Sequence, residues 1–144
     1  MNVEELFSQE GIQQFAEIEL TPERLRLTFS QPILFDPGRA ELKPEAIPIL
    51  HRVANIFRKI PNEITIEGHT DNLPITSQSS YGSNWELSTA RAHTVLKYYI
   101  EHEGIAPSRM GATGYGEYRP LTTNDTSEGQ KKNRRIEISV RRLD

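Results

Sequence analysis

Asp71 and Arg91 are the residues of this sequence whose types and spacing best suit the binding of a charged ligand. Asp71 follows an alternating segment, residues 64–69, that is typical of a strand. Arg91 falls inside a helix expected to begin near Asn84, beyond a polar loop of residues 72–83. A carboxylate at a strand end and a guanidinium on the next helix, placed across a cleft, suit a zwitterion that carries both an ammonium and a carboxylate.

Each residue of this pair also has a plainer interpretation. Asp71 precedes Asn72, and such a dipeptide is common in turns. Arg91 is equally compatible with a solvated arginine on a helix surface. Taken one at a time, neither residue distinguishes a binding role from a structural role, so the segments around them are needed to decide.

Alternation of apolar and polar residues predicts the strands around the pair. The clearest example is residues 24–29, where Leu25, Leu27 and Phe29 are expected to face a core. Residues 31–40 and 116–132 hold prolines and glycines and are expected to be loops. The expected strands comprise residues 17–20, 24–29, 64–69, 110–115 and 136–141.

The helix that carries Arg91 is the best marked helix of the chain. Ser83 and Glu86 have the spacing of a capping box, and Gly104 fits a C-terminal cap, which predicts a helix over residues 84–103. Trp85 in its first turn is expected to lie in the core. Two further helices are expected: one within residues 3–15, and one from about Pro44 whose apolar stripe comprises Ile47, Leu50, Val53, Ala54 and Phe57.

The length and composition favour one folded domain. The chain has 144 residues, of which 35% are hydrophobic and 26% charged, and it contains no cysteine, which excludes disulfides and cysteine-based metal sites. The order of elements predicts an α+β fold, an α/β sandwich in which helices cover one face of a mixed β-α-β-α-β-β sheet. An added N-terminal helix and strand precede it. We expect residues 1–15 to be a helix or linker and residues 16–144 to form the domain.

Neither nucleic acid nor a metal ion is an expected ligand. Residues 131–142 hold six basic residues against one acidic residue, but the net charge of the whole chain is −3. His69 alternates with Asp71, yet His51, His93 and His102 complete no clear set of metal ligands, so no metal or cofactor is predicted and His69 is interpreted as a packed or hydrogen-bonded residue.

Four ordered motifs carry a resemblance to a known family. The sequence resembles OmpA-like peptidoglycan-binding domains in G-H-T-D (68–71), N-W-E-L-S-T-A-R-A (84–92), G-Y-G-E-Y-R-P (114–120) and N-R-R-I-E-I (133–138). The segments L-F-D-P-G-R-A-E-L-K-P-E-A (34–46) and H-T-D-N-L-P-I (69–75) are similar to those of flagellar stator proteins of the MotB kind. The resemblance extends from about residue 11 to residue 142.

The resemblance implies a ligand and a set of contacts. The ligand of the family is the peptide stem of peptidoglycan, recognised mainly through diaminopimelate. Asp71 would bind the side-chain ammonium and Arg91 the neighbouring carboxylate, and either Arg134 or Arg135 would complete the rim, with Arg135 favoured. The remaining contacts implied by the resemblance are Thr70, Asn84, Leu87, Phe35 and Asp36.

The resemblance also implies a role and a location. A noncatalytic domain would anchor the stator of the flagellar motor to the cell wall, as a homodimer beside a MotA-like membrane partner. It would face the periplasm, and the full-length protein would be anchored in the cytoplasmic membrane by one N-terminal helix. Asp36 and Asp71 could form a catalytic carboxylate pair, but both are explained as ligand contacts, so no enzyme activity is expected. The alternative function is a general wall anchor of the OmpA or Pal type, unrelated to motility.

Overall fold

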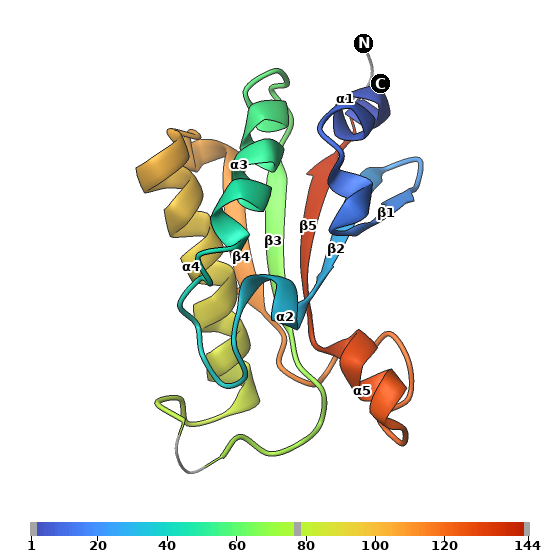
Figure 1. The fold of residues 1–144 in the computed structure, drawn as a ribbon, viewed down its shortest axis with the longest axis vertical. Coiled ribbons are helices and arrows are strands. Elements are labelled where there is room, and N and C mark those ends of the chain that lie inside the picture. Colours follow the sequence, from blue (N-terminus) through green and yellow to red (C-terminus); the bar gives the residue numbers. More distant parts are fainter. Residues whose placement is uncertain (1–2, 77–78, 143–144) are drawn as a thin grey trace.

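Five strands form one mixed sheet in the computed structural model, which describes residues 3–76 and 79–142 (Figure 1). The spatial order is β1-β2-β5-β3-β4. Strands β3 and β4 are parallel, and the other neighbouring strands are antiparallel. The strands are β1 (Glu17–Leu20), β2 (Arg24–Ser30), β3 (Ile64–His69), β4 (Met110–Gly114) and β5 (Arg135–Arg141).

Helices α3 and α4 cover one face of this sheet (Figure 1). This arrangement confirms the predicted α+β fold with helices on one face. None of the helices within residues 3–76 and 79–142 combines the length and apolar character that a bilayer crossing requires. The helices are α1 (Val3–Gln9), α2 (Gln31–Leu34), α3 (Ala46–Phe57), α4 (Asn84–Glu103) and α5 (Ser127–Asn133), with 3-10 turns at Ile12–Gln14 and Pro107–Arg109.

The core lies between the sheet and α3 and α4. Leu25, Leu27 and Phe29 of β2 are fully buried, as their alternation predicts. The predicted stripe of α3 is wrong at Ile47, which is 38% exposed. The helix begins at Ala46, and its buried side follows Ala46, Ile49 and Leu50, so Ile47 is rotated toward the rim of the helix.

The N-terminal segment packs on this core. Leu6, Phe7 and Ile12 belong to the same hydrophobic cluster as Leu50 of α3. The boundary placed between residues 15 and 16 stays a prediction.

Trp85 is not a core residue, since it is 49% exposed. Two glycines explain why. A Cβ atom on Gly68 would lie 2.2 Å from the Ser88 carbonyl oxygen, and one on Gly114 would lie 2.2 Å from the Thr89 amide nitrogen. The backbone of α4 therefore rests directly on β3 and β4 at this level, which leaves no space for an indole between helix and sheet.

Two short helices occupy segments predicted as loops. Helix α5 is capped by Thr126, whose hydroxyl accepts a hydrogen bond from the amide of Gly129. Its sequence, S-E-G-Q-K-K-N, has no apolar stripe, so hydrophobic spacing could not reveal it. Helix α2 spans a single turn within the predicted loop of residues 31–40.

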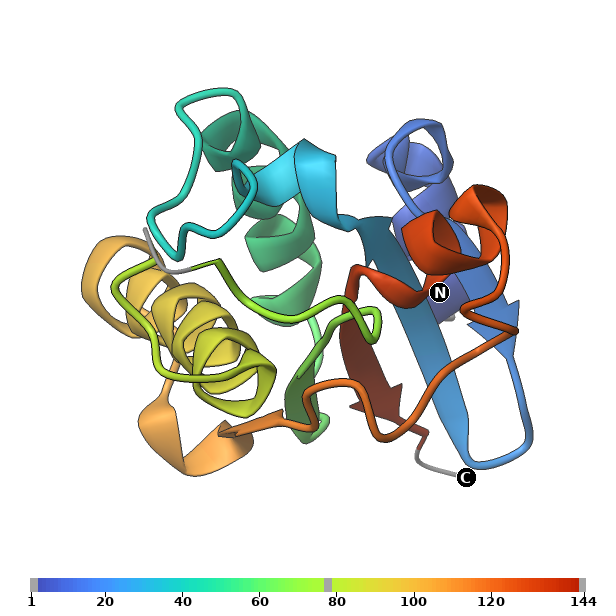
Figure 2. The same ribbon diagram turned by 90° about the horizontal axis from the view of Figure 1, so that it is seen from below.

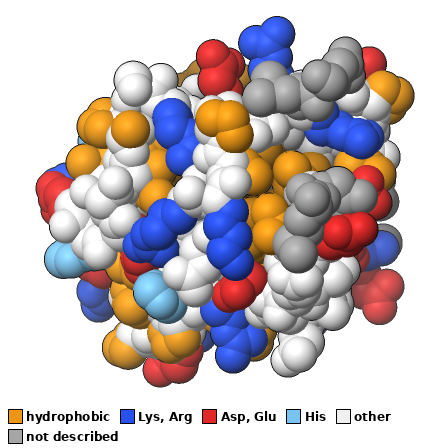
Figure 3. All heavy atoms as spheres, turned by 90° about the horizontal axis from the view of Figure 1, so that it is seen from above, with side chains coloured by type: hydrophobic (Ala, Val, Ile, Leu, Met, Phe, Trp, Pro, Cys, Tyr) orange, Lys and Arg blue, Asp and Glu red, His pale blue; other side chains and the backbone are white. Residues whose placement is uncertain are grey.

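The two ends of the molecule differ. At one end, seen in Figure 3, basic and acidic side chains are interspersed over the surface. The other end, seen in Figure 2, holds the end of β3, the start of α4, helices α2 and α5, and the long loop after β3. That second end is where the residues singled out in the sequence come together.

Candidate functional site

A cavity of about 430 Å³ lies at this second end of the molecule, and both Asp71 and Arg91 line it. We call it the Asp71–Arg91 cavity. The segment directly after β3 supplies polar lining residues, α4 forms one wall, and α2 with the loop after it forms another. The lining residues are Gln31, Pro32, Pro37, Gly38, Thr70, Asp71, Leu73, Pro74, Ile75, Thr76, Asn84, Leu87, Arg91 and Arg134.

Asp71 is held by two contacts that leave it facing the cavity. Its Oδ1 accepts a hydrogen bond from the amide of Leu73 at 3.1 Å, which fixes the turn after β3. Its Oδ2 forms an ion pair with Nη1 of Arg134 at 2.5 Å. The residue is only 5% exposed. Asp71 is therefore both the turn residue that its neighbour Asn72 suggested and a charged group in the cavity.

Arg91 is a buried cation without a carboxylate partner in the part of the chain that the structure describes. Its Nε donates to the carbonyl of Arg39 at 2.7 Å, and its Nη2 donates to the carbonyl of Asp36 at 3.1 Å. Burial lowers the pKa of Arg91 to about 10, against a smaller opposing effect of Tyr81. The guanidinium is thus desolvated and positively charged at neutral pH, which favours an anion in the cavity.

Arg134 lines the cavity, whereas Arg135, the favoured residue, does not. Arg134 is the C-cap of α5, just before β5 begins, and its side chain reaches Asp71. Arg135 is the first residue of β5. Because side chains two residues apart share a face of a strand, its Nε lies 2.6 Å from Oε2 of Glu137, on the side of the sheet away from the helices. The placement of Arg135 in the cavity rim is therefore corrected.

Three of the expected residues lie at the cavity as anticipated. The amide nitrogen of the Asn84 side chain donates to the carbonyl of Leu73 at 2.8 Å, and the Thr70 hydroxyl donates to the carbonyl of Asp71 at 2.8 Å. Leu87 is buried and contributes an apolar surface. Asn84 and Thr70 thus hold the backbone of the loop that carries Asp71.

Phe35 and Asp36 act behind the cavity rather than in its lining. Phe35 is fully buried, and its ring lies 5.4 Å from the guanidinium carbon of Arg91. Asp36 contributes its backbone carbonyl to Arg91, while its side chain is exposed. These two residues therefore position Arg91.

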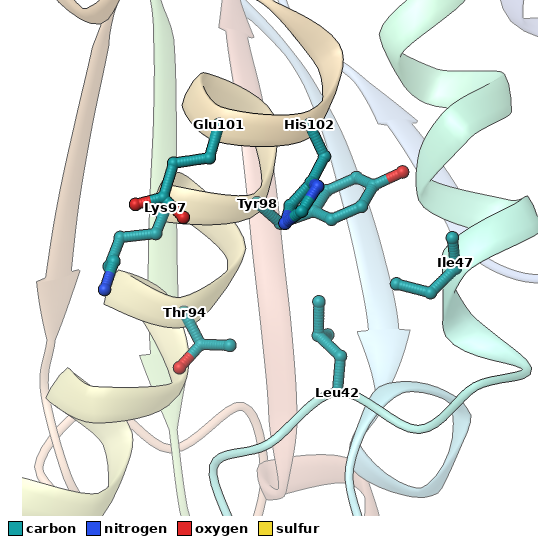
Figure 4. A pocket seen from close by; sticks show the side chains of 7 residues that line it. All are labelled: Leu42, Ile47, Thr94, Lys97, Tyr98, Glu101 and His102. Atoms are coloured by element: carbon teal, nitrogen blue, oxygen red, sulfur yellow. The ribbon is translucent and has the colours of Figure 1, made fainter.

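A second hollow, of about 560 Å³, lies between α3 and α4 (Figure 4). Tyr98 and His102 stack and project toward Ile47 of α3. The phenol of Tyr98 donates a hydrogen bond to buried Glu103, so its polar atom is already satisfied. The hollow lacks a buried unpaired charge within the described residues, and for that reason it is a weaker candidate site.

One group of side chains has the composition of a metal site. Glu67, His69 and Glu137 offer ligand atoms within 4.8 Å of one another. Glu137, however, lies 2.6 Å from Nε of Arg135 and 3.1 Å from Nε of Arg26. Two guanidinium groups already offset its charge, so this arrangement is better described as an ion-pair network than as a cation site.

Known proteins share much of this sequence. The sequence matches the OmpA family over residues 34–134. It is 37% identical to Motility protein B of Bacillus subtilis over 139 residues, which cover 96% of this chain and 53% of that protein. It is 39% identical over 110 residues to the peptidoglycan-binding protein ArfA of Mycobacterium tuberculosis, covering 76% of this chain and 32% of that protein. The chain thus spans about half the length of Motility protein B, and less of ArfA.

Two solved structures share the fold across nearly the whole chain. A putative MotB-like protein from Desulfovibrio vulgaris superposes with a TM-score of 0.91 at 31% identity, covering 98% of this chain and 90% of that one. The cell wall anchor of the T6SS from Pseudomonas aeruginosa superposes with a TM-score of 0.87 at 32% identity, covering 99% of this chain and 98% of that one.

Proposed function

This chain belongs to the OmpA family, and from that premise we propose that it binds peptidoglycan in the Asp71–Arg91 cavity without catalysing a reaction. The name of ArfA, a peptidoglycan-binding relative, supports the polymer as the ligand. The similarity to a cell wall anchor supports a mechanical rather than a chemical role.

The observation that carries the proposal is the uncompensated charge of Arg91. A buried guanidinium that donates only to carbonyls costs free energy unless an anion binds nearby. A ligand carboxylate in the cavity would supply that anion through a charge-assisted contact, worth about 1.5–3 kcal/mol.

The ligand group we propose is the zwitterionic side chain of diaminopimelate in the peptide stem. Its carboxylate would bind Arg91, and its ammonium would bind Asp71, which also forms an ion pair with Arg134. Two opposite contacts fix the direction of the ligand. Because a wall presents many copies of the stem, a modest affinity at each site is sufficient for anchoring.

For the whole protein we propose the role of a stator component of the flagellar motor. The similarity to Motility protein B, which covers 96% of this chain, supports this role. The domain would face the periplasm as a homodimer. One N-terminal helix of the full-length protein would anchor it in the cytoplasmic membrane, beside a MotA-like partner. Anchoring to the wall would keep the ion-driven part from turning with the rotor.

A second candidate is a wall anchor with no part in motility, and the similarity to the T6SS anchor favours it. The two roles separate in a graft experiment. This chain replaces the corresponding region of Motility protein B in Bacillus subtilis, and swimming is measured. Restored swimming supports the stator role; wall binding without swimming supports the general anchor.

Co-sedimentation with purified sacculi tests the binding site itself. We expect Asp71→Ala and Arg91→Ala each to weaken binding by about 100-fold, the effect of losing one partner of a buried charged contact. Asp125→Ala and Arg141→Ala are matched controls on exposed side chains and should bind like the wild type. Folded Asp71→Ala and Arg91→Ala proteins that still sediment with sacculi would refute the assignment.

A further inference from the structure

Trp85 and Tyr118 form an exposed aromatic pair beside the Asp71–Arg91 cavity. Their ring centroids lie 5.3 Å apart with an angle of 46° between the planes. Trp85 is 49% exposed and Tyr118 is 67% exposed. Large aromatic side chains that remain this accessible next to each other are typical of binding surfaces, because their burial by a ligand is favourable.

The pair is held rigidly relative to the cavity. The amide of Gly116 donates to the hydroxyl of Ser88 on α4 at 2.8 Å, and its carbonyl accepts from the amide of Thr70 at 2.9 Å. Gly116 has a φ of +59° and lies against the backbone of Trp85, where a Cβ atom would come within 3.2 Å. The loop that bears Tyr118 is thus fastened both to α4 and to the residue before Asp71.

Tyr115 also stabilises this loop, through contacts with His69 and Arg119. Its ring stacks on His69 at the end of β3, with centroids 5.4 Å apart, and the guanidinium carbon of Arg119 lies 3.8 Å above it. The turn between Tyr115 and Arg119 therefore has little freedom, and the Tyr118 ring that extends from it contacts Trp85. A preorganised aromatic surface loses little entropy when a ligand covers it.

We propose that Trp85 and Tyr118 bind a sugar ring of the glycan strand whose peptide stem occupies the Asp71–Arg91 cavity. The inference rests on the proposed function, because that polymer joins sugar and peptide covalently. Trp85 follows Asn84 in the chain, and Gly116 of the loop that bears Tyr118 accepts a hydrogen bond from the amide of Thr70. Because Asn84 and Thr70 both line the cavity, the aromatic pair lies next to it. Pyranose rings present apolar C–H faces that pack on aromatic rings, and their hydroxyls remain solvated at an open surface.

The sequence contains a single tryptophan, so its fluorescence reports on this pair alone. Three probes are titrated: a free stem tripeptide containing diaminopimelate, the same tripeptide on its disaccharide, and chitotetraose. Emission is followed in the wild type, and calorimetry gives the affinities of all proteins, since the Trp85 variants contain no tryptophan. We expect the disaccharide–tripeptide to shift Trp85 emission and to bind more tightly than the tripeptide. Trp85→Ala and Tyr118→Ala should each bind the disaccharide–tripeptide about tenfold more weakly, yet bind the tripeptide unchanged.

The controls separate the two proposals. Trp85→Phe retains a ring and should recover most of the affinity, and Leu20→Ala removes an exposed side chain on β1, at the far edge of the sheet, without effect. If Trp85→Ala binds the disaccharide–tripeptide and chitotetraose like the wild type, the sugar contact is refuted. If the wild type fails to bind the tripeptide but its affinity for the disaccharide–tripeptide depends on Trp85, the peptide assignment fails and the sugar contact stands.

Discussion

Helix α4 buries one charged side chain in each half. The two differ in their partners. Near its C-terminal end, Glu103 receives Nη2 of Arg58 at 2.5 Å, Nδ1 of His51 at 3.0 Å and the hydroxyl of Tyr98. In its N-terminal half, Arg91 donates only to backbone carbonyls. The same helix thus carries one charge with its partners in place and another without a counter-ion in the described part of the chain.

The pKa shifts of Glu103 and Arg91 agree with this difference in partners. Burial acts to raise the pKa of Glu103, but hydrogen bonds from Tyr98, Arg58 and His51 outweigh it and lower the pKa. Burial lowers the pKa of Arg91 to about 10, and no neighbouring carboxylate among the described residues restores it. We infer that the Glu103 contacts stabilise the fold, whereas the Arg91 environment is built for a ligand.

The largest expected effect is a loss of binding, with little loss of stability, when Arg91 is replaced. Arg91→Met keeps the apolar part of the side chain and removes the charge, so binding to sacculi should fall by about 100-fold. The free energy of unfolding should stay within about 1 kcal/mol of the wild type, because an unpaired buried charge is removed. Urea unfolding and co-sedimentation measure the two quantities. A variant that unfolds far more easily would mean that Arg91 is structural.

The reverse result is expected at Glu103. Glu103→Gln leaves Arg58 without its buried partner, and the free energy of unfolding should decrease by about 2–3 kcal/mol. Binding to sacculi at a temperature where the variant is folded should be unchanged. If binding fell with stability, the two halves of α4 would not be independent.

A third variant should lower both the stability of the protein and its binding to sacculi. Gly114→Ala would place a Cβ atom 2.2 Å from the Thr89 amide nitrogen, so α4 must shift away from β4. We expect a loss of about 1–3 kcal/mol in unfolding free energy together with weaker binding. Gly111→Ala on the same strand is the control, since a Cβ atom there meets no atom within 4 Å. Equal stability of the two variants would contradict the close approach of α4.

The smallest effect concerns pH. The pKa of Glu103 is lower in the folded protein than its ordinary value of 4.5, so its contribution is present above that value and is lost as the pH falls through the folded pKa. The difference in unfolding free energy between wild type and Glu103→Gln should therefore shrink as the pH falls below 4.5. A difference that grows in acid would contradict this assignment.

The sequence predicted the elements that carry the pair better than it predicted their surroundings. The bounds of β3 and α4 agree with the prediction, because strict alternation marks one and a Ser83 cap and Gly104 mark the other. Trp85 was misplaced because hydrophobic spacing cannot register a helix held against glycine backbones. Arg135 was favoured over Arg134 because α5, the helix that precedes Arg134 and sets its direction, has no apolar stripe to reveal it.

The site illustrates the same limit. The sequence has opposite charges at positions 71 and 91, and the structure brings both to one cavity. The sequence could not show that Asp71 pairs with Arg134 or that Arg91 donates to the carbonyls of Asp36 and Arg39, because contacts across more than 50 residues leave no local pattern. Those contacts are what distinguish a paired charge from an unpaired one.

Calorimetric titration with two stem tripeptides tests the central claim most directly. One contains diaminopimelate, and the other has lysine in its place, which keeps the side-chain ammonium but lacks the carboxylate. If Arg91 binds that carboxylate, the lysine peptide should bind about 100-fold more weakly to the wild type, and Arg91→Met should bind both peptides equally weakly. Equal affinity of the wild type for the two peptides would contradict the account.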